Sequence, residues 1–277
     1  MERVRGAVEL TRPGNAIAAG VLTFIGAFVA AGLTEPVSAA AAVLATTLAT
    51  GGGNAINDYF DREIDAINRP ERPIPRGAIS PRATVVFSGG LFVSAIGLTL
   101  LLPPLAIAIA VINLLALIVY TELFKGLPGV GNALVAYLTG STFLYGGAAV
   151  GGDLRTVTVL FALAAGATMA REIVKDVEDI EGDREEGLRT LPVVLGERSA
   201  LAIATVFVVC AVLISPVPYL RGTFGGVYLI GLGPTIGGLL VGTYRSFGDP
   251  TAGQTWLKAS MFLAAVAFVV GRAAVVL

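Results

Sequence analysis

The chain has 277 residues, of which 55% are hydrophobic and only 14% are Asp, Glu, Lys or Arg. This balance excludes a water-soluble domain, in which about 25% of the residues are charged. A net charge of −1 argues against a nucleic-acid partner, because nucleic-acid-binding proteins carry an excess of basic residues. The chain has no histidine and a single cysteine, Cys210, which excludes histidine-based metal sites, imidazole bases, cysteine clusters and internal disulfides.

Long apolar runs follow one another along the whole chain. A membrane helix needs about 20 mostly apolar residues to cross the hydrocarbon layer, and roughly nine such runs are bounded by charges, proline or glycine. We therefore predict an all-α, polytopic membrane bundle of about nine transmembrane helices in a single domain, residues 1–277, because only helices satisfy their own backbone in lipid at this length. The predicted spans cover about 14–32, 37–57, 84–101, 104–122, 130–150, 156–177, 200–214, 225–244 and 256–277.

The basic residues lie almost entirely on one side of these predicted spans. If the N-terminus is inside the cell, sixteen of the 19 Lys and Arg residues fall in inside segments, and only Arg155, Arg221 and Arg272 fall outside. Cytoplasmic loops of membrane proteins carry such an excess. We therefore predict a multi-pass protein of the cell membrane, with its N-terminus and its functional site on the cytoplasmic side.

Two acidic clusters with the same spacing lie at the ends of the second and sixth predicted spans. Residues 57–65 read NDYFDREID and residues 175–183 read KDVEDIEGD, and both contain D-x-x-D-x-x-x-D at an offset of 118 residues. This offset indicates a weak internal repeat. Residues at i, i+3 and i+7 share one helix face. The sequence therefore predicts two stripes, formed by Asp58, Asp61 and Asp65 and by Asp176, Asp179 and Asp183, with Asn54 and Glu172 extending them.

Carboxylates that share one helix face repel one another unless a cation lies among them. Hard oxygen ligands suit Mg²⁺, which prefers a few carboxylates together with water and phosphate oxygens. The two stripes therefore predict a site that holds a diphosphate through shared Mg²⁺. Two other interpretations remain, namely solvated charges at helix ends and a cation transport path. Transport would favour acids near mid-span in broken helices, whereas these acids lie beside basic loops.

Two stretches around the clusters resemble the signatures of UbiA-type membrane prenyltransferases. Residues 51–80 read GGGNAINDYFDREIDAINRPERPIPRGAIS and resemble the first signature. Residues 171–196 read REIVKDVEDIEGDREEGLRTLPVVLG and resemble the second. The YTELFK stretch at 120–125 and the count of about nine spans also match the family layout. The second stretch is most similar to archaeal enzymes of ether-lipid synthesis, whereas the first is also similar to chlorophyll synthases.

The resemblance implies an Mg²⁺-dependent membrane prenyltransferase. It implies transfer of a geranylgeranyl group from geranylgeranyl diphosphate to the free hydroxyl of geranylgeranylglyceryl phosphate, in archaeal ether-lipid synthesis. The expected partners are then a prenyl diphosphate, a phosphate-bearing lipid acceptor and the bilayer. Transfer to a ring acceptor, as in chlorophyll synthases, is the alternative within the family, and cation transport is the alternative of another class.

The resemblance also assigns roles at the leaving group. The expected primary Mg²⁺ ligands are Asp61, Asp65, Asp179 and Asp183, with Asn57, Asp58 and Asp176 in support. Stabilising the departing diphosphate lowers the barrier most, so Asp61, Asp179 and Lys125 are the expected catalytic residues. Lys175 is a second candidate for the leaving-group cation, and Tyr120 is a candidate hydrogen-bond donor.

The phosphate of the implied acceptor requires a second anion site. The planar donor fork of arginine suits such a site, and the candidates are Arg12, Arg69, Arg72 and Arg76, with Arg171 and Arg189 from the other half. The expected substrate-binding residues as a whole are Arg12, Asn54, Arg72, Arg76, Tyr120, Lys125, Arg171 and Lys175. Phe143, Tyr145 and Phe161 are candidates for lining a channel for the prenyl tail, although core packing is the first expectation for each of them.

Overall fold

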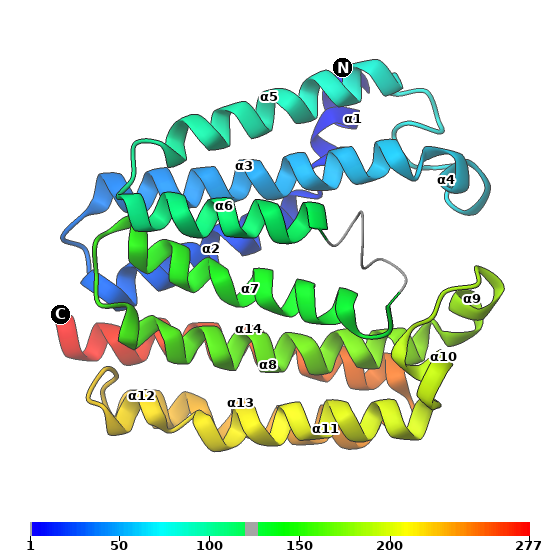
Figure 1. The fold of residues 1–277 in the computed structure, drawn as a ribbon. Helices are drawn as coiled ribbons and strands as arrows, with labels where there is room; N and C mark the ends of the chain where they lie inside the picture. The colour runs from blue at the N-terminus through cyan, green and yellow to red at the C-terminus, as the bar shows by residue number, and fades with distance from the viewer. Residues whose placement is uncertain (1, 120–126) are drawn as a thin grey trace.

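The computed structural model describes residues 2–119 and 127–277, and every regular element in these two ranges is an α-helix. The helices are connected mostly by short loops (Figure 1). They are α1 (Glu2–Leu10), α2 (Pro13–Ala31), α3 (Pro36–Phe60), α4 (Arg62–Asn68), α5 (Pro81–Thr99), α6 (Pro104–Val119), α7 (Val130–Ala149), α8 (Leu154–Glu178), α9 (Ile180–Glu185), α10 (Leu191–Leu195), α11 (Glu197–Ile214), α12 (Val217–Leu220), α13 (Val227–Ser246) and α14 (Pro250–Val276).

Proline marks the beginning of several long helices. Pro13, Pro36, Pro81 and Pro250 are the first residues of α2, α3, α5 and α14. Proline suits this position because its fixed φ matches the helix and its missing N–H would have no partner there. These local signals explain why the predicted spans and the observed helices begin within a few residues of each other.

Seven stretches in the described part of the chain are long and apolar enough to cross a membrane: α2, α3, α5, α8, α11 together with α12, α13 and α14. The predicted count of about nine is therefore not confirmed. The fourth predicted span forms the shorter helix α6, and its predicted end near residue 122 lies outside the described residues. The fifth forms α7, which has 20 residues but contains polar side chains and several glycines.

The long helices run roughly side by side, and their connections lie at the two ends of the bundle (Figure 1). Helix α7 packs against α2 and α8, α3 packs against both α2 and α5, and α13 packs against α14. The short helices α4, α9 and α10 lie together at one end, on the right in Figure 1. This end is called the α4–α9 end below.

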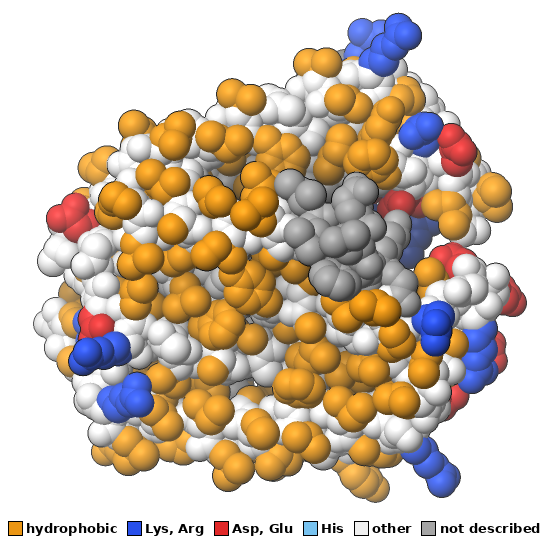
Figure 2. Space-filling model, in the orientation of Figure 1, with side chains coloured by type: hydrophobic (Ala, Val, Ile, Leu, Met, Phe, Trp, Pro, Cys, Tyr) orange, Lys and Arg blue, Asp and Glu red, His pale blue; other side chains and the backbone are white. Residues whose placement is uncertain are grey.

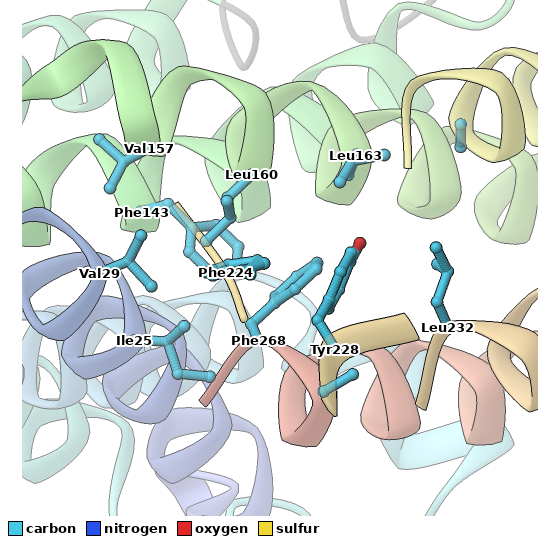
Figure 3. Close-up of a cluster of buried hydrophobic side chains, with 12 residues drawn as sticks. Ile25, Val29, Phe143, Val157, Leu160, Leu163, Phe224, Tyr228, Leu232 and Phe268 are labelled. Atoms are coloured by element: carbon cyan, nitrogen blue, oxygen red, sulfur yellow. The ribbon is translucent and has the colours of Figure 1, made fainter. Parts of the chain in front are cut away.

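An aromatic cluster joins α7, α13 and α14 inside the bundle (Figure 3). The rings of Phe224 and Tyr228 lie 4.8 Å apart between centroids, and the ring of Phe268 stacks on both at 5.8 and 6.2 Å. Phe143 from α7 meets the edge of Phe268. The buried Tyr228 hydroxyl donates a hydrogen bond of 2.7 Å to the Ser215 carbonyl. The polar end of this tyrosine is therefore paired inside the apolar cluster.

Apolar side chains cover the middle of the visible surface, and charged side chains gather at its two ends, mostly at the α4–α9 end (Figure 2). Leu101, Leu213 and Ile230 have relative exposures of 78, 72 and 74%. In water, so much exposed apolar surface would favour aggregation. In a bilayer it faces hydrocarbon, which is the arrangement expected of a membrane-spanning bundle.

Candidate functional site

The two acidic clusters lie at the α4–α9 end of the bundle, each at a joint between a long and a short helix (Figure 1). Asp61 is the C-cap of α3 and the N-cap of α4, and Asp179 is the C-cap of α8 and the N-cap of α9. Both residues have a ψ close to 0°, with φ of −83° and −93°. Each predicted stripe is therefore interrupted at its middle aspartate instead of continuing along one straight helix.

The first cluster contains two buried carboxylates that are bound by arginine. Asp58 and Asp65 have relative exposures of 5 and 6%. Arg72 lies between them and pairs with both carboxylates, while Arg12 approaches Asp58 with 2.6 Å between Nη2 and Oδ1. Hydrogen bonds of this charge-assisted kind are short and strong. The structure therefore brings Arg12, Arg72, Asp58 and Asp65 into one network.

The turn between α1 and α2 positions Arg12. In the described residues, Arg12 is the only non-glycine residue with a positive φ, 46°, a conformation that is uncommon outside glycine. The Asn54 side chain donates a hydrogen bond of 2.9 Å to the Thr11 carbonyl of this turn. The structure thus places the predicted substrate-binding residue Asn54 against the backbone beside Arg12.

Arg76 lies apart from this network. Its guanidinium binds Glu9 at 2.5 Å and the Glu71 carbonyl at 2.7 Å. The hydrogen bond from Arg76 lowers the pKa of Glu9 below its ordinary value. The contact ties the loop after α4 to helix α1. Arg69, in the same loop, is exposed.

The second cluster has partners without charge. The Asn132 amide, from the first turn of α7, donates a hydrogen bond of 2.8 Å to Asp176. The Thr190 hydroxyl donates one of 2.8 Å to Asp183. Asn132 is buried, and the other three side chains are half-buried. The second cluster is therefore oriented by neutral donors, in contrast to the first.

A further network ties α8 to α14 beside the second cluster. Arg171 pairs with Glu172 and also donates a hydrogen bond to the Gln254 side chain. Gln254 donates in turn to Glu178, which also accepts a hydrogen bond from Thr251. The guanidinium of Arg171, a predicted substrate-binding group, is thus largely engaged by protein partners.

Several predicted residues are exposed at this end of the bundle: Asn57, Asp61, Lys175, Asp179 and Arg189. Asp61 and Asp179 make no side-chain hydrogen bond or ion pair with the residues that the structure describes. Tyr120 and Lys125 lie outside the described residues. Exposed oxygens that are free of protein partners are available to a ligand or to a cation.

The donor chemistry of both clusters fits Mg²⁺, since carboxylate and amide oxygens are hard ligands. However, residues 2–119 and 127–277 contain no group of three or more acidic side chains gathered closely enough to hold a metal ion. Water molecules, or the oxygens of a bound diphosphate, would therefore have to complete the coordination shell. In the first cluster, Arg72 also engages oxygens of Asp58 and Asp65 that a metal would use.

The three channel candidates take part in packing. Phe143 lies in the aromatic cluster. The Tyr145 hydroxyl lies 2.8 Å from the Thr99 hydroxyl, and Phe161 meets the edge of the Tyr137 ring. Each ring is buried or half-buried among its neighbours, in agreement with the expectation of core packing.

Sequence reasoning missed Asn132 and Thr190. Thr190 follows Asp183 by seven residues, as Arg72 follows Asp65, so the repeat itself could have pointed to it. Asn132 is a polar residue at the start of a predicted span, and polar groups inside membrane helices usually have a partner there.

Comparison with known proteins identifies relatives along the whole chain. The sequence model of the UbiA prenyltransferase family matches residues 19–266. The chain is 75% identical to a digeranylgeranylglyceryl phosphate synthase of Natronomonas pharaonis, with 100% of both chains covered. A solved structure concerning digeranylgeranylglyceryl phosphate synthase in membranes is 36% identical, covers 98% of this chain and 99% of its own, and superposes with a TM-score of 0.84. A UbiA homologue from Archaeoglobus fulgidus, bound to DMAPP and Mg²⁺, shares the fold at 20% identity, 98% and 99% coverage and a TM-score of 0.75.

Proposed function

The chain belongs to the UbiA prenyltransferase family, and from this premise we propose its reaction. It transfers a geranylgeranyl group from geranylgeranyl diphosphate to the free hydroxyl of geranylgeranylglyceryl phosphate, a step of archaeal ether-lipid synthesis. The observation that carries this proposal is the 75% identity to the Natronomonas pharaonis synthase over the full length of both chains. The exposed apolar surface of this chain is typical of a membrane protein and agrees with substrates that carry long isoprenoid tails.

The acidic clusters are the proposed diphosphate end of the site. Asp61, Asp65, Asp179 and Asp183 would hold Mg²⁺, with Asn57, Asp58 and Asp176 in support. The bound metal would neutralise charge on the departing diphosphate. The Archaeoglobus fulgidus homologue bound to DMAPP and Mg²⁺ supports this choice of metal and of substrate class. Asp61 and Asp179 are the most available ligands, because both are exposed and lie at the helix joints.

The arginines of the same end are the proposed phosphate-binding groups. Arg12 uses one terminal nitrogen on Asp58, and its side chain is 43% exposed, so the rest of its five-donor guanidinium can reach a phosphate. Arg72 is its neighbour on the same carboxylate. Arg76 and Arg171 bind acidic side chains outside the two aspartate clusters and are therefore weaker candidates. Lys125 remains the proposed leaving-group cation, with Lys175 and Tyr120 as further candidates.

The internal repeat and the membrane orientation are also proposals. Helices α3 and α8 both have 25 residues, and their first residues are 118 positions apart. The first residues of α4 and α9 are also 118 positions apart. These matching bounds support a duplicated unit. If α6 and α7 also cross the membrane, they bring the seven candidate spans to nine. The distribution of basic residues supports a cytoplasmic α4–α9 end.

Reconstituted protein with labelled geranylgeranyl diphosphate and geranylgeranylglyceryl phosphate tests the reaction. We expect a product with that pair, and we expect Asp61→Asn and Asp179→Asn each to lower turnover at least about 100-fold, as for other groups that stabilise a leaving-group charge. Glu181→Gln is the matched control, because this acid is exposed on α9 and has no side-chain partner in the described chain.

Three outcomes would overturn parts of the proposal. A product formed only with a ring acceptor would replace the acceptor. Full activity in both aspartate variants would remove the metal assignment. Cation flux into liposomes that depends on the same aspartates, without any prenyl transfer, would favour a transporter.

A further inference from the structure

The two halves of the candidate site are alike in their carboxylates but differ in what binds them. Asp58 and Asp65 correspond to Asp176 and Asp183 at the offset of 118 residues, and Arg72 corresponds to Thr190. Arg72 pairs with both carboxylates of the first cluster, whereas Thr190 gives Asp183 a neutral hydrogen bond of 2.8 Å. Arg12 adds a second positive charge to the first cluster.

This difference changes how each cluster meets a divalent cation. At the first cluster, a metal has to compete with a guanidinium for the same buried oxygens and is repelled by its charge. At the second cluster, the described hydrogen-bond partners of Asp176 and Asp183 are an amide and a hydroxyl, which do not repel a cation. The charge of the exposed Lys175 acts on Asp176 from a distance and does not occupy its oxygens as Arg72 occupies those of the first cluster. Asp179, at the helix joint beside them, adds an exposed carboxylate.

We propose that Arg72, together with Arg12, keeps the first cluster closed to metal until a diphosphate arrives, so that the divalent cation enters the second cluster first. This inference rests on the proposed function, because it concerns the order in which that site is filled. Arginine binds phosphate through two parallel hydrogen bonds. A diphosphate can therefore draw the Arg72 guanidinium away from Asp58 and Asp65, and the Arg12 guanidinium away from Asp58. Both carboxylates are then free for the second metal ion.

The position of Arg72 suits this exchange. Its side chain is 19% exposed, whereas those of Asp58 and Asp65 are 6 and 9% exposed. The arginine therefore reaches the surface of the cluster and the acids lie beneath it. Arg72 belongs to the loop after α4, which Arg76 ties separately to Glu9, so a change at the Arg72 guanidinium leaves that anchor in place.

Mn²⁺ binding to purified protein without any prenyl substrate tests the inference, with bound and free Mn²⁺ counted by electron paramagnetic resonance. We expect one tight site in the unmodified chain and a second site at least tenfold weaker. Asp183→Asn should remove the tight site. Arg72→Thr installs the residue that the second half has, and it should tighten the weak site at least threefold, although Arg12 still pairs with Asp58 in this variant. Arg82→Thr removes a cation of the same end without touching either cluster and should change neither site.

The reciprocal variant protects the test against a folding defect in Arg72→Thr. Thr190→Arg places a guanidinium beside Asp183 and should weaken the tight site at least tenfold. Two equal sites in the unmodified chain would overturn the inference, and so would a tight site that survives Thr190→Arg. Adding a non-reactive geranylgeranyl thiodiphosphate, corrected for Mn²⁺ that it binds alone, should tighten the weak site.

Failure of this inference differs from failure of the proposed function. Equal Mn²⁺ sites together with normal transfer to geranylgeranylglyceryl phosphate would overturn only the order of metal entry. Absence of transfer with the expected substrate pair, together with one tight and one weak Mn²⁺ site, would overturn only the reaction.

Discussion

Replacing Gly146 by alanine would place a methyl group inside the contact between α2 and α7. A Cβ at this position would lie 2.0 Å from the Thr23 carbonyl oxygen and 2.9 Å from the Ala27 nitrogen. Both are backbone atoms, which cannot rotate away as a side chain can. The two helices would have to separate by roughly an ångström or more before the new Cβ reached an ordinary van der Waals distance from these atoms.

The expected cost follows from the kind of contact. Inserting a methyl group into well-packed interiors costs typically about 1–3 kcal/mol, and close approach through small residues is a main source of helix association in membranes. Because the obstructing atoms are backbone, we expect the upper end, about 3 kcal/mol. For a chain of this size, that loss corresponds to a fall of roughly 6–12 °C in the unfolding midpoint.

Thermal unfolding of the protein in detergent, followed by intrinsic fluorescence, measures the effect. Gly97→Ala is the control, because Gly97 lies in α5 and a Cβ there would meet nothing within 4 Å. Alanine favours the helix over glycine by about 0.5–1 kcal/mol, so this control should unfold slightly higher. Equal midpoints for the two variants would refute the reasoning from close helix contact.

Three further predictions concern the metal, the core and the N-terminal contact. Chelation of divalent ions should stop prenyl transfer without loss of helical circular dichroism, and added Mg²⁺ should restore transfer; activity that persists in a chelator would contradict the metal proposal. Tyr228→Phe should destabilise the bundle by about 1–3 kcal/mol, because the buried Ser215 carbonyl loses its hydrogen bond, and an unchanged midpoint would contradict this. Arg76 lowers the pKa of Glu9 in the folded state. The contact between Arg76 and Glu9 therefore stabilises the fold above the ordinary glutamate pKa of 4.5, and this stabilisation is lost as the pH falls through the lowered pKa of Glu9 in the folded state. The difference in unfolding midpoint between the unmodified chain and Glu9→Gln should therefore close in acid, and a constant difference would argue against the contact.

The sequence predicted the helical class, the approximate ends of the long helices and the presence of both acidic clusters at helix ends. These features depend on local composition, such as the prolines that begin α2 and α3. The breaks at Asp61 and Asp179 were not predicted, because aspartate is tolerated in a helix and the break depends on what the next turn packs against. The assigned roles of these aspartates stay predictions.

The partner of each carboxylate could not be read from the sequence either. Arg76 binds Glu9, which lies 67 residues earlier in the chain, and that choice depends on how the loop after α4 folds back on α1. Arg72, four residues before it, binds Asp58 and Asp65 instead. Both arginines have the same chemistry, so only the path of the loop distinguishes an arginine of the site from an arginine that anchors the loop.

The polar character of α7 has a consequence for how the protein enters the membrane during synthesis. A helix partitions into lipid by its own apolarity, and α7 is not among the helices that are apolar enough to do so alone. It packs against α2 and α8, and its Asn132 finds its partner, Asp176, on α8. We therefore expect that α7 depends on its neighbours for stable insertion and that it enters the membrane together with α8. The amide that orients the second acidic cluster would then be in place as soon as α7 and α8 have packed together.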